Sequence, residues 1–410
     1  MRIELLTTGS ELLLGIVQNT HVAWVAGELR TMGLRIEQQV TVPDGDAVRE
    51  AISDAVQRAD VLIVTGGLGP TSDDVTREAT AQALGVDLIE DEHAVRVIKE
   101  FFASRERAMP LSNLKQAQVP CGAEVLPNLN GTAPGVFVPQ RLGDHACAVF
   151  LLPGPPSELY PMFKAEVPHR LRALAELDSD QGMVSLKVMG VGESDLHDVL
   201  DKALHEIEGL EVGYCARPYE VDLRLIGKED ARTQGAQMVR EAYARELVSE
   251  DGASLEEVVI RSCAARGWNL ATAESCTGGL ISSMLTDVAG ASEVLTHGFV
   301  TYANEAKIQS LGVPEELIET QGAVSEEVAI AMAQGACKVA GSDLALSVTG
   351  IAGPCGGSVE KPVGTAWMAV ASADGKVFTQ KVLHPKSRIA FKRLVALRVL
   401  DFLRLKALRS

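Results

Sequence analysis

The chain has 410 residues, of which 46% are hydrophobic and 23% charged, a composition that is typical of globular proteins and excludes a disordered, collagen-like or coiled-coil chain. Its 55 acidic and 38 basic residues give a net charge of −17, which repels nucleic acid and anionic lipid. We therefore expect neither nucleic acid nor a membrane as a partner, and the length corresponds to roughly two to three domains.

Strands and helices alternate in the first part of the chain, which predicts βαβ crossovers and a doubly wound α/β domain with a parallel sheet. The expected strands are Ile3–Thr7, Ile36–Val42, Val61–Val64 and Cys147–Leu152, and the expected helices are Thr20–Met32, Asp46–Ala59 and a segment near Ser157–Leu174. Aromatic residues make up only 4% of the chain, so we expect a core of Ala, Val, Leu and Ile, which suits buried parallel strands.

A glycine-rich loop at 65–76 follows the strand Val61–Val64. Backbone N–H groups of such a loop can approach an anion closely, and the dipole of the next helix favours negative charge. The loop lacks the Lys-Ser/Thr pair of a Walker loop and the third glycine of a dinucleotide fingerprint. Asp73 and Asp74 are either N-cap residues of the next helix, or one caps it while the other holds a divalent cation against a phosphate.

A polar break at Leu177–Gly182 precedes a compact middle block. Within it we expect strands at Val184–Met189 and Glu220–Ile226, helices at Glu193–Ile207 and Asp230–Val248, and then a linker at Ser249–Ser254. Residues 168–254 contain 10 basic and 18 acidic residues. This charge is unfavourable for binding a nucleic-acid backbone, so we expect a structural or interdomain role here rather than RNA binding.

The last part of the chain begins a new α/β pattern. Its expected helices are Leu255–Arg266, Gly278–Val288 and Arg388–Leu408, and its expected strands are Asn269–Ala273, Gly298–Tyr302, Asp343–Val348 and Gly364–Ala371. Residues 255–410 contain 15 basic and 15 acidic residues, so the whole net negative charge lies in the first 254. This difference indicates a separate functional unit.

A serine in the segment Glu274–Gly279, between an expected strand and an expected helix, is the first candidate nucleophile. A tight turn of this kind presents the hydroxyl of Ser275 clear of the backbone and beside N–H groups that could stabilise an oxyanion. Taken alone, a serine at such a position is more often an N-cap than a nucleophile. Cys276 is the rival nucleophile, although its side chain should point away from that of Ser275 and no histidine partner is evident.

A serine nucleophile needs a base. Lys307 can serve if burial lowers its pKa enough to leave the amine neutral, with Tyr302 relaying or orienting the proton. The alternative for Lys307 is a solvated lysine at the start of a helix. His297 begins a strand without an obvious partner, and we expect a structural role for it.

Basic residues gather at the C-terminal end of the sequence. Residues 381–410 contain nine of them against one acid, Asp401: Lys381, Lys386, Arg388, Lys392, Arg393, Arg398, Arg404, Lys406 and Arg409. Arg388 begins the last expected helix, where a guanidinium could clamp a phosphate together with helix N–H groups. The alternative is that this face is solvated or meets an acidic surface of a partner chain.

The cysteines and the start of the chain bear on its compartment. Seven cysteines without any C-x-x-C pair make a disulfide framework or a cysteine-based zinc site improbable. Charged residues stand near the N-terminus where a signal peptide would need an apolar segment. These features favour a reducing cytoplasm.

The motifs together resemble the CinA family (competence/damage-inducible protein A). In the last part the resemblance rests on E-S-C-T-G-G at 274–279, Y-x-N-x-x-K at 302–307, T-G-I-A-G-P at 349–354 and K-P-V-G at 361–364. In the first part it rests on the loops at 8–15, 65–76, 113–117, 128–135 and 152–156, and in the middle on G-V-G-E at 190–193. The resemblance implies a molybdopterin-binding-like domain at 1–170, a KH-like α+β domain at 176–250 and an α/β amidase domain of the PncC type at 255–410.

For the last domain, the resemblance implies a nicotinamide mononucleotide deamidase of pyridine-nucleotide salvage that needs no cofactor. Ser275 would attack the carboxamide, while Tyr302 and Lys307 move protons. The residues expected against the substrate are Thr277, Gly278, Gly279, Gly350, Ala352, Gly353 and Arg388.

For the first domain, the resemblance implies hydrolysis of ADP-ribose with a divalent cation such as Mg²⁺ or Co²⁺. The nucleotide would be bound by Gly66, Gly67, Gly69, Thr71, Asn130 and Gly131, and the metal by Asp73 and Asp74. A homodimer is also implied. The alternative is a non-catalytic protein that binds a pterin or nucleotide, or a scaffold with a role in competence or the response to DNA damage.

Overall fold

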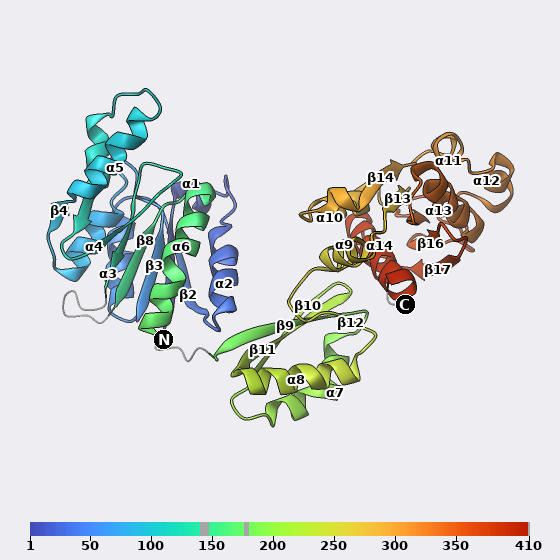
Figure 1. Ribbon diagram of the computed structural model, residues 1–410, viewed down its shortest axis with the longest axis horizontal. Helices are drawn as coiled ribbons and strands as arrows, with labels where there is room; N and C mark the ends of the chain where they lie inside the picture. The colour runs from blue at the N-terminus through green and yellow to red at the C-terminus, as the bar shows by residue number, and fades with distance from the viewer. Residues whose placement is uncertain (140–146, 176–179, 409–410) are drawn as a thin grey trace. The chain divides into compact units, whose positions relative to one another are not determined.

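The computed structural model describes residues 1–139, 147–175 and 180–408. Contacts divide the chain into two compact units, the first made of Met1–Met183 with Gly227–Glu229 and the second of Val184–Ile226 with Asp230–Ser410 (Figure 1). The polar break predicted at Leu177–Gly182 lies partly outside the described residues. The middle and last parts of the chain therefore share one unit.

A six-stranded sheet with strand order β2-β1-β3-β8-β7-β6 forms the centre of the first unit. Strands β2, β1, β3 and β8 are parallel, β7 runs antiparallel to β8, and β6 runs antiparallel to β7. Strands β4 and β5 pair in a small separate sheet. The elements in chain order are β1 (Ile3–Thr8), α1 (Ser10–Leu13), α2 (His21–Thr31), β2 (Ile36–Val42), α3 (Asp46–Val56), β3 (Val61–Thr65), α4 (Thr76–Leu84), β4 (Leu88–Glu90), α5 (Glu92–Ala103), a 3₁₀ helix (Leu111–Ala117), β5 (Gln118–Pro120), β6 (Glu124–Leu126), β7 (Gly135–Val138), β8 (Ala148–Leu152) and α6 (Pro156–Leu174).

Both faces of this sheet are covered by helices. Successive side chains of a strand point to opposite faces, so Leu62 packs with Ile52 of α3 on one side, while Ile63 packs with Leu29 of α2 and Phe163 of α6 on the other. The doubly wound α/β architecture expected from the sequence is confirmed.

A four-stranded sheet with strand order β10-β11-β9-β12 forms the middle domain. Apolar side chains from its strands pack with those of two helices in one core. The elements are β9 (Gly182–Met189), α7 (Glu193–His205), β10 (Glu211–Arg217), β11 (Glu220–Gly227), α8 (Glu229–Ala242) and β12 (Leu247–Ser249).

Two expectations for this domain are wrong. Strand β10 was not expected, and the helix expected at Asp230–Val248 ends at Ala242 and is followed by a strand. The helix ends early because of a tertiary contact: Leu247 pairs with Val188 at the edge of β9. The local sequence pattern does not indicate such a pairing.

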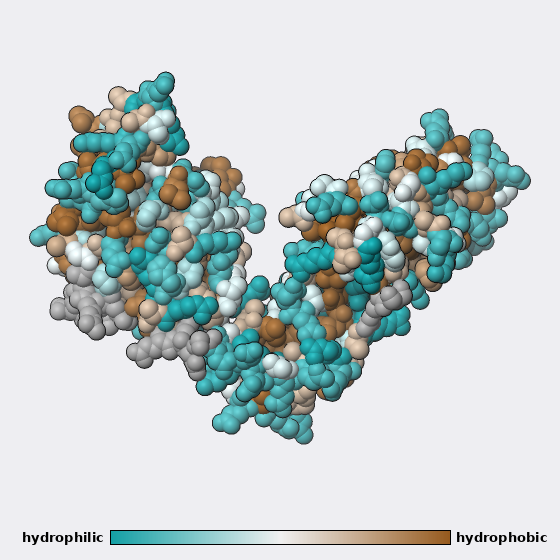
Figure 2. All heavy atoms as spheres, viewed as in Figure 1, coloured by the Kyte–Doolittle hydropathy of each residue, from teal (hydrophilic) through white to brown (hydrophobic). Residues whose placement is uncertain are grey.

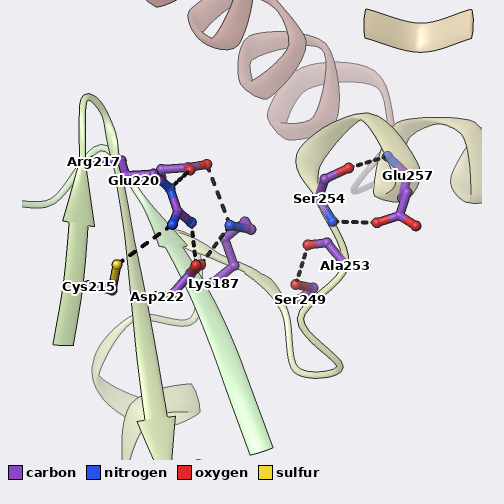
Figure 3. A network of polar contacts seen from close by, with 9 residues as sticks. All are labelled: Lys187, Cys215, Arg217, Glu220, Asp222, Ser249, Ala253, Ser254 and Glu257. Carbon is purple, nitrogen blue, oxygen red and sulfur yellow. Dashed lines mark hydrogen bonds and ion pairs between the residues drawn. The ribbon is translucent and has the colours of Figure 1, made fainter. Parts of the chain in front are cut away.

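Polar side chains form a network on the middle domain's sheet (Figure 3). Lys187 lies 2.6 Å from Asp222 and 3.5 Å from Glu220, and Arg217 contacts both carboxylates. Two cations and two anions thus neutralise one another, so this network leaves no surplus positive charge for a nucleic-acid backbone.

A five-stranded sheet with strand order β14-β13-β15-β16-β17 forms the last domain. Strands β14, β13 and β15 are parallel, β16 runs antiparallel to β15, and β17 runs antiparallel to β16. The elements are α9 (Leu255–Arg266), β13 (Leu270–Glu274), α10 (Leu280–Thr286), a 3₁₀ turn (Ala291–Glu293), β14 (Leu295–Val300), α11 (Asn304–Leu311), α12 (Glu315–Gln321), α13 (Glu326–Ala340), β15 (Leu344–Gly350), β16 (Thr365–Ser372), β17 (Val377–Leu383), α14 (Arg388–Leu403) and a final π-helical turn (Arg404–Leu408).

Helices again cover both faces of the sheet in this domain. Leu346 packs with Val259 of α9 and Phe391 of α14 in one core, whereas Ala345 packs with Met332 of α13 in another. The parallel strands therefore lie between two helical layers, and loops rather than helices surround their carboxyl ends.

Apolar side chains lie mainly inside each unit, and hydrophilic residues dominate the face shown in Figure 2. Within the described ranges, the structure contains no helix with the length and apolar character needed to cross a bilayer.

Candidate active site

The carboxyl ends of β13, β14 and β15 bring three loops together. The backbone N–H of Ser275, just after β13, donates to the carbonyl of Val348 in β15 at 3.0 Å. The N–H of Thr301, just after β14, donates to the carbonyl of Glu274 at 2.8 Å. These bonds extend the sheet past its strand ends, at the edge where ligands usually bind in open α/β sheets.

Ser275 and Lys307 meet at this edge. The Nζ of Lys307, which projects from α11, lies 3.2 Å from the Oγ of Ser275, and the lysine is only 1% exposed. Nζ also lies 2.9 Å from the carbonyl of Thr301 and 3.4 Å from that of Tyr302. The solvated lysine considered as an alternative is excluded by this burial.

Burial lowers the pKa of Lys307, because a low-dielectric environment disfavours the ammonium form. A neutral amine keeps two N–H bonds, one for each of the two carbonyls, and its lone pair is then free for the hydroxyl hydrogen of Ser275. The arrangement can therefore remove a proton from the serine.

A buried carboxylate holds the turn that follows Ser275. Glu274 is 0% exposed and accepts bonds from the backbone N–H groups of Gly279, Ile281 and Ser282 and from the Ser282 hydroxyl, at 2.7–3.0 Å. It therefore satisfies the free N–H groups at the start of α10. The function that the sequence left open for Ser275, capping this helix, belongs to Glu274 instead.

Two glycines of the turn have positive φ angles, +63° at Gly278 and +91° at Gly279. Residues with a Cβ are strained in this region, which explains the two glycines between Thr277 and α10. The helix expected at Gly278–Val288 accordingly begins only at Leu280. Thr277 is fully buried, and its Oγ1 has no hydrogen-bond partner within the described residues.

Cys276 is unfavourable as a nucleophile. Its side chain is buried at 5% exposure, and burial raises the pKa of its thiol to about 12. The reactive form of cysteine is the thiolate, so this thiol stays unreactive near neutral pH.

Tyr302 and Arg388 form a second polar group, anchored on the loop that carries Gly353. Strand β14 ends at Val300, two residues before the expected strand end, and Tyr302 is 60% exposed. Its hydroxyl accepts from Nη2 of Arg388 at 2.7 Å, while Nη1 donates to the carbonyl of Gly353 at 3.0 Å. In the part of the chain that the structure describes, no hydrogen bond joins this phenol to Ser275 or Lys307, so the phenol is oriented by Arg388.

Two other predicted substrate contacts have packing roles in the structure. A Cβ on Gly350 would stand 2.9 Å from the backbone oxygen of Thr365 and from the Cβ of Ala366, so glycine allows β15 and β16 to approach there. Ala352 is 6% exposed and belongs to the core between the sheet and α14. Both residues shape the loop that carries Gly353.

The first unit contains a separate cavity of about 490 Å³ at the carboxyl ends of its parallel strands. Gly66, Gly67 and Gly69 line it as predicted. A Cβ on Gly67 would come within 2.1 Å of the Oγ1 of Thr76, so glycine is required by the close approach of α4. His21 also lines the cavity, and burial lowers its pKa, which favours the neutral imidazole.

The two predicted metal-binding aspartates differ in position. Asp74 lines the cavity, but Asp73 is not among its lining residues. The Oδ2 of Asp74 accepts bonds from the N–H and hydroxyl of Thr71. Helix α4 begins at Thr76 after the N-cap Val75, so the prediction that either aspartate caps this helix is wrong.

The other predicted nucleotide-binding residues shape a neighbouring loop. Asn130 donates to the carbonyl of Ser157 at 2.7 Å, and a Cβ on Gly131 would overlap the carboxylate of Glu158. Neither residue lines the cavity, nor does Thr71. Over the described ranges, the protein gathers no group of three or more His, Cys, Asp or Glu side chains able to hold a metal, so a cation here would need ligands from the substrate as well.

Comparison with known proteins identifies three consecutive segments. Residues 4–173 match the model described as probable molybdopterin binding domain, residues 185–251 that of the damage-inducible protein CinA KH domain, and residues 252–407 that of the CinA C-terminal domain. A CinA-like protein of Akkermansia muciniphila is 48% identical over 400 residues, which cover 98% of this chain and 96% of the relative. A putative competence-damage inducible protein of Caldicellulosiruptor bescii is 42% identical, with 98% of each chain covered.

The chain belongs to the CinA family. Among solved structures, a competence/damage inducible protein from Agrobacterium tumefaciens is 42% identical over 36% of this chain and 91% of its own, with a TM-score of 0.36.

Some residues of this CinA chain have roles that motif reading missed. Glu274 was visible only as the first letter of E-S-C-T-G-G, and the carbonyls of Thr301 and Tyr302 carry no side-chain signal at all. Glu274 could have been found as an acid shortly before a helix that lacks Ser, Thr, Asp or Asn at its N-cap.

Proposed function

We propose that the last domain hydrolyses the carboxamide of nicotinamide mononucleotide, giving nicotinic acid mononucleotide and ammonia. The 3.2 Å contact between the Oγ of Ser275 and the buried Nζ of Lys307 carries this proposal, because it pairs a nucleophile with a base. Such a pair is the minimum that nucleophilic catalysis of amide hydrolysis requires.

The proposed reaction begins with attack by Ser275 on the carboxamide carbon, as its hydroxyl proton passes to the neutral amine of Lys307. Those backbone N–H groups of the turn after Ser275 that are not already bonded to Glu274 or to the Ser275 carbonyl stabilise the negative oxygen. The C–N bond then breaks, and the ammonium of Lys307 returns the proton to the leaving nitrogen, so ammonia departs. Water attacks the resulting ester, gives a proton to Lys307, and Ser275 regains it as the acid is released.

Arg388 and Tyr302 suit substrate positioning. Their mutual bond and the bond from Arg388 to the carbonyl of Gly353 fix the orientation of the guanidinium. A fixed guanidinium favours the phosphate of a mononucleotide through bidentate hydrogen bonding. The proton-transfer role expected for Tyr302 requires a substrate-bound arrangement in which the phenol leaves Arg388.

The test compares Ser275→Ala with Cys276→Ala in the full chain. Ser275→Ala should reduce ammonia release from nicotinamide mononucleotide by at least 10³-fold, as is usual when a catalytic nucleophile is removed, while circular dichroism shows an intact fold. Cys276→Ala should keep most of the activity. Full activity of Ser275→Ala, or a folded but inactive Cys276→Ala, would overturn the assignment.

We further propose that the first unit hydrolyses ADP-ribose with a divalent cation. The cavity lined by Gly66, Gly67 and Gly69 supports this, because backbone N–H groups at such a position bind phosphate. Asp74 is the predicted carboxylate that lines the cavity, and it would hold the cation together with substrate phosphates.

The test measures hydrolysis of ADP-ribose. After chelation of metal ions, Mg²⁺ or Co²⁺ should restore hydrolysis, and Asp74→Asn should abolish it. Binding of a pterin without any hydrolysis would favour the non-catalytic alternative.

A further inference from the structure

Lys392 is a cation near Ser275 that the proposed reaction does not use. It lies on α14, four residues after Arg388, so both side chains share one face of the helix. Its Nζ lies 3.6 Å from the point where a Cβ on Gly278 would stand. Lys392 therefore reaches the turn that follows the candidate nucleophile.

No counter-charge engages this lysine within the described residues. The structure gives Lys392 no ion pair and no side-chain hydrogen bond there, although the residue is half-buried. The one fully buried carboxylate of the turn, Glu274, is already occupied by four donors. The ammonium of Lys392 therefore has no anionic partner in the described part of the chain, and an anionic ligand can pair with it.

Arg388 supplies a second cation one helical turn away. Its Nη1 and Nη2 groups are anchored on Gly353 and Tyr302, which fixes the orientation of the guanidinium and leaves further N–H bonds for a ligand. Gly278 has no Cβ, so the space beside the Nζ of Lys392 stays open. Two cations and a glycine turn together provide the chemistry that a phosphate dianion requires.

We propose that Lys392 and Arg388 jointly bind the phosphate monoester of the substrate, with Lys392 as the residue that distinguishes a nucleotide from an uncharged nucleoside. This inference rests on the proposed function, since it assigns the phosphate of the same substrate. Lys392 is a binding residue and takes no part in the proton transfers between Ser275 and Lys307.

The test uses the full chain with three variants: Lys392→Gln, Lys392→Arg and, as a matched control, Lys338→Gln on the exposed side of α13. Calorimetry measures binding of ribose 5-phosphate, with ribose as the probe without phosphate. Any binding in the first unit's cavity is common to all variants, so it cancels in the comparison.

Lys392→Gln should weaken the binding of ribose 5-phosphate to the last domain at least tenfold. It should raise the KM for nicotinamide mononucleotide by a similar factor while kcat changes less than threefold. Lys392→Arg should stay within threefold of the wild type, and Lys338→Gln should be unchanged. Unchanged affinity and KM in a folded Lys392→Gln would overturn the inference.

The two proposals can fail separately. If ribose 5-phosphate binds and Lys392→Gln weakens it, but the protein releases no ammonia, the phosphate site stands and the amidase proposal fails. If ammonia is released with the same KM by wild type and Lys392→Gln, the amidase proposal stands and the phosphate site fails.

Discussion

The reactivity of the candidate site depends on one amine that is held away from water. Lys307 is almost fully buried and faces two carbonyls and the hydroxyl of Ser275, and burial lowers the pKa of its side chain. The protonated amine has no lone pair, so only the fraction of molecules with neutral Lys307 can take the proton from Ser275.

This dependence predicts the pH profile of ammonia release. At low pH Lys307 is an ammonium and kcat/KM should be small; it should rise as pH increases through the lowered pKa and then become constant. The midpoint should lie below the ordinary lysine value of about 10.4. The measurement is kcat/KM for nicotinamide mononucleotide against pH.

Lys307→Arg is the matched variant, because a guanidinium stays protonated throughout this range. It should be inactive at every pH. A Lys307→Arg variant with a wild-type profile would show that another group is the base.

At the residue scale, the sequence was enough to predict that Ser275 and Lys307 would lie close together, since both follow strands of one parallel sheet. It was not enough to place the Tyr302 phenol, which the structure finds on Arg388. That contact joins residues 86 positions apart in the chain, and no local pattern encodes it.

Helix α10 shows how an element depends on a single side chain that lies shortly before it in the chain. It has only seven residues, which is too short for a helix to be stable by itself. Glu274 accepts three of its N-terminal backbone N–H groups and one hydroxyl from a fully buried position. The same contacts fix the turn at Gly278 and Gly279.

Glu274→Gln should therefore destabilise α10 selectively. One oxygen becomes an NH₂ group that faces N–H donors, and leaving buried donors unsatisfied costs about 1–3 kcal/mol. Hydrogen exchange of the α10 amides should become faster, and ammonia release should fall because the turn after Ser275 loosens. The control is Glu319→Gln on the exposed side of α12, and equal exchange in both variants would contradict the capping role.

At the scale of elements, the strands that form βαβ units and the helices α2, α3, α6 and α9 were predicted closely, because their periodicity and their loops agree. Helices α5 and α13 were not predicted. The helix expected to continue to Val248 was wrong, since pairing of Leu247 with Val188 in β9 outweighs local helical preference. Strand β10 was missed although its sequence alternates: Val212 and Tyr214, two residues apart, pack against the core of the middle domain.

Buried polar contacts connect the middle and last domains within the second unit. Tyr219, next to β11, donates to the Oδ2 of Asp401 in α14 at 2.9 Å. Asp401 also pairs with Arg404 at 2.7 Å, and both side chains are nearly buried. Arg404 in turn donates to the carbonyls of Arg245 and Leu247. The middle and last domains are therefore coupled through α14, the helix that also carries Arg388 and Lys392.

Asp401→Asn should weaken these contacts between the middle and last domains. Removing one member of a buried ion pair costs about 3–5 kcal/mol, because the other charge stays buried without its partner. The linker at 249–254 should be cleaved faster in limited proteolysis. Asp374→Asn, which removes an exposed pair with Lys376, should leave the cleavage rate unchanged, and a wild-type rate in Asp401→Asn would refute the coupling.

The sequence by itself determined the class of each domain, the positions along the chain of the strands that surround the site and the presence of a serine and a lysine just after two of these strands. These features follow from local periodicity, turn residues and the geometry of parallel sheets. Only the tertiary structure decided that the amine is buried, that Glu274 caps α10, that Asp73 lies away from the cavity and that Lys392 reaches Gly278. Burial and long-range contacts depend on how whole elements pack, which no short stretch of sequence specifies.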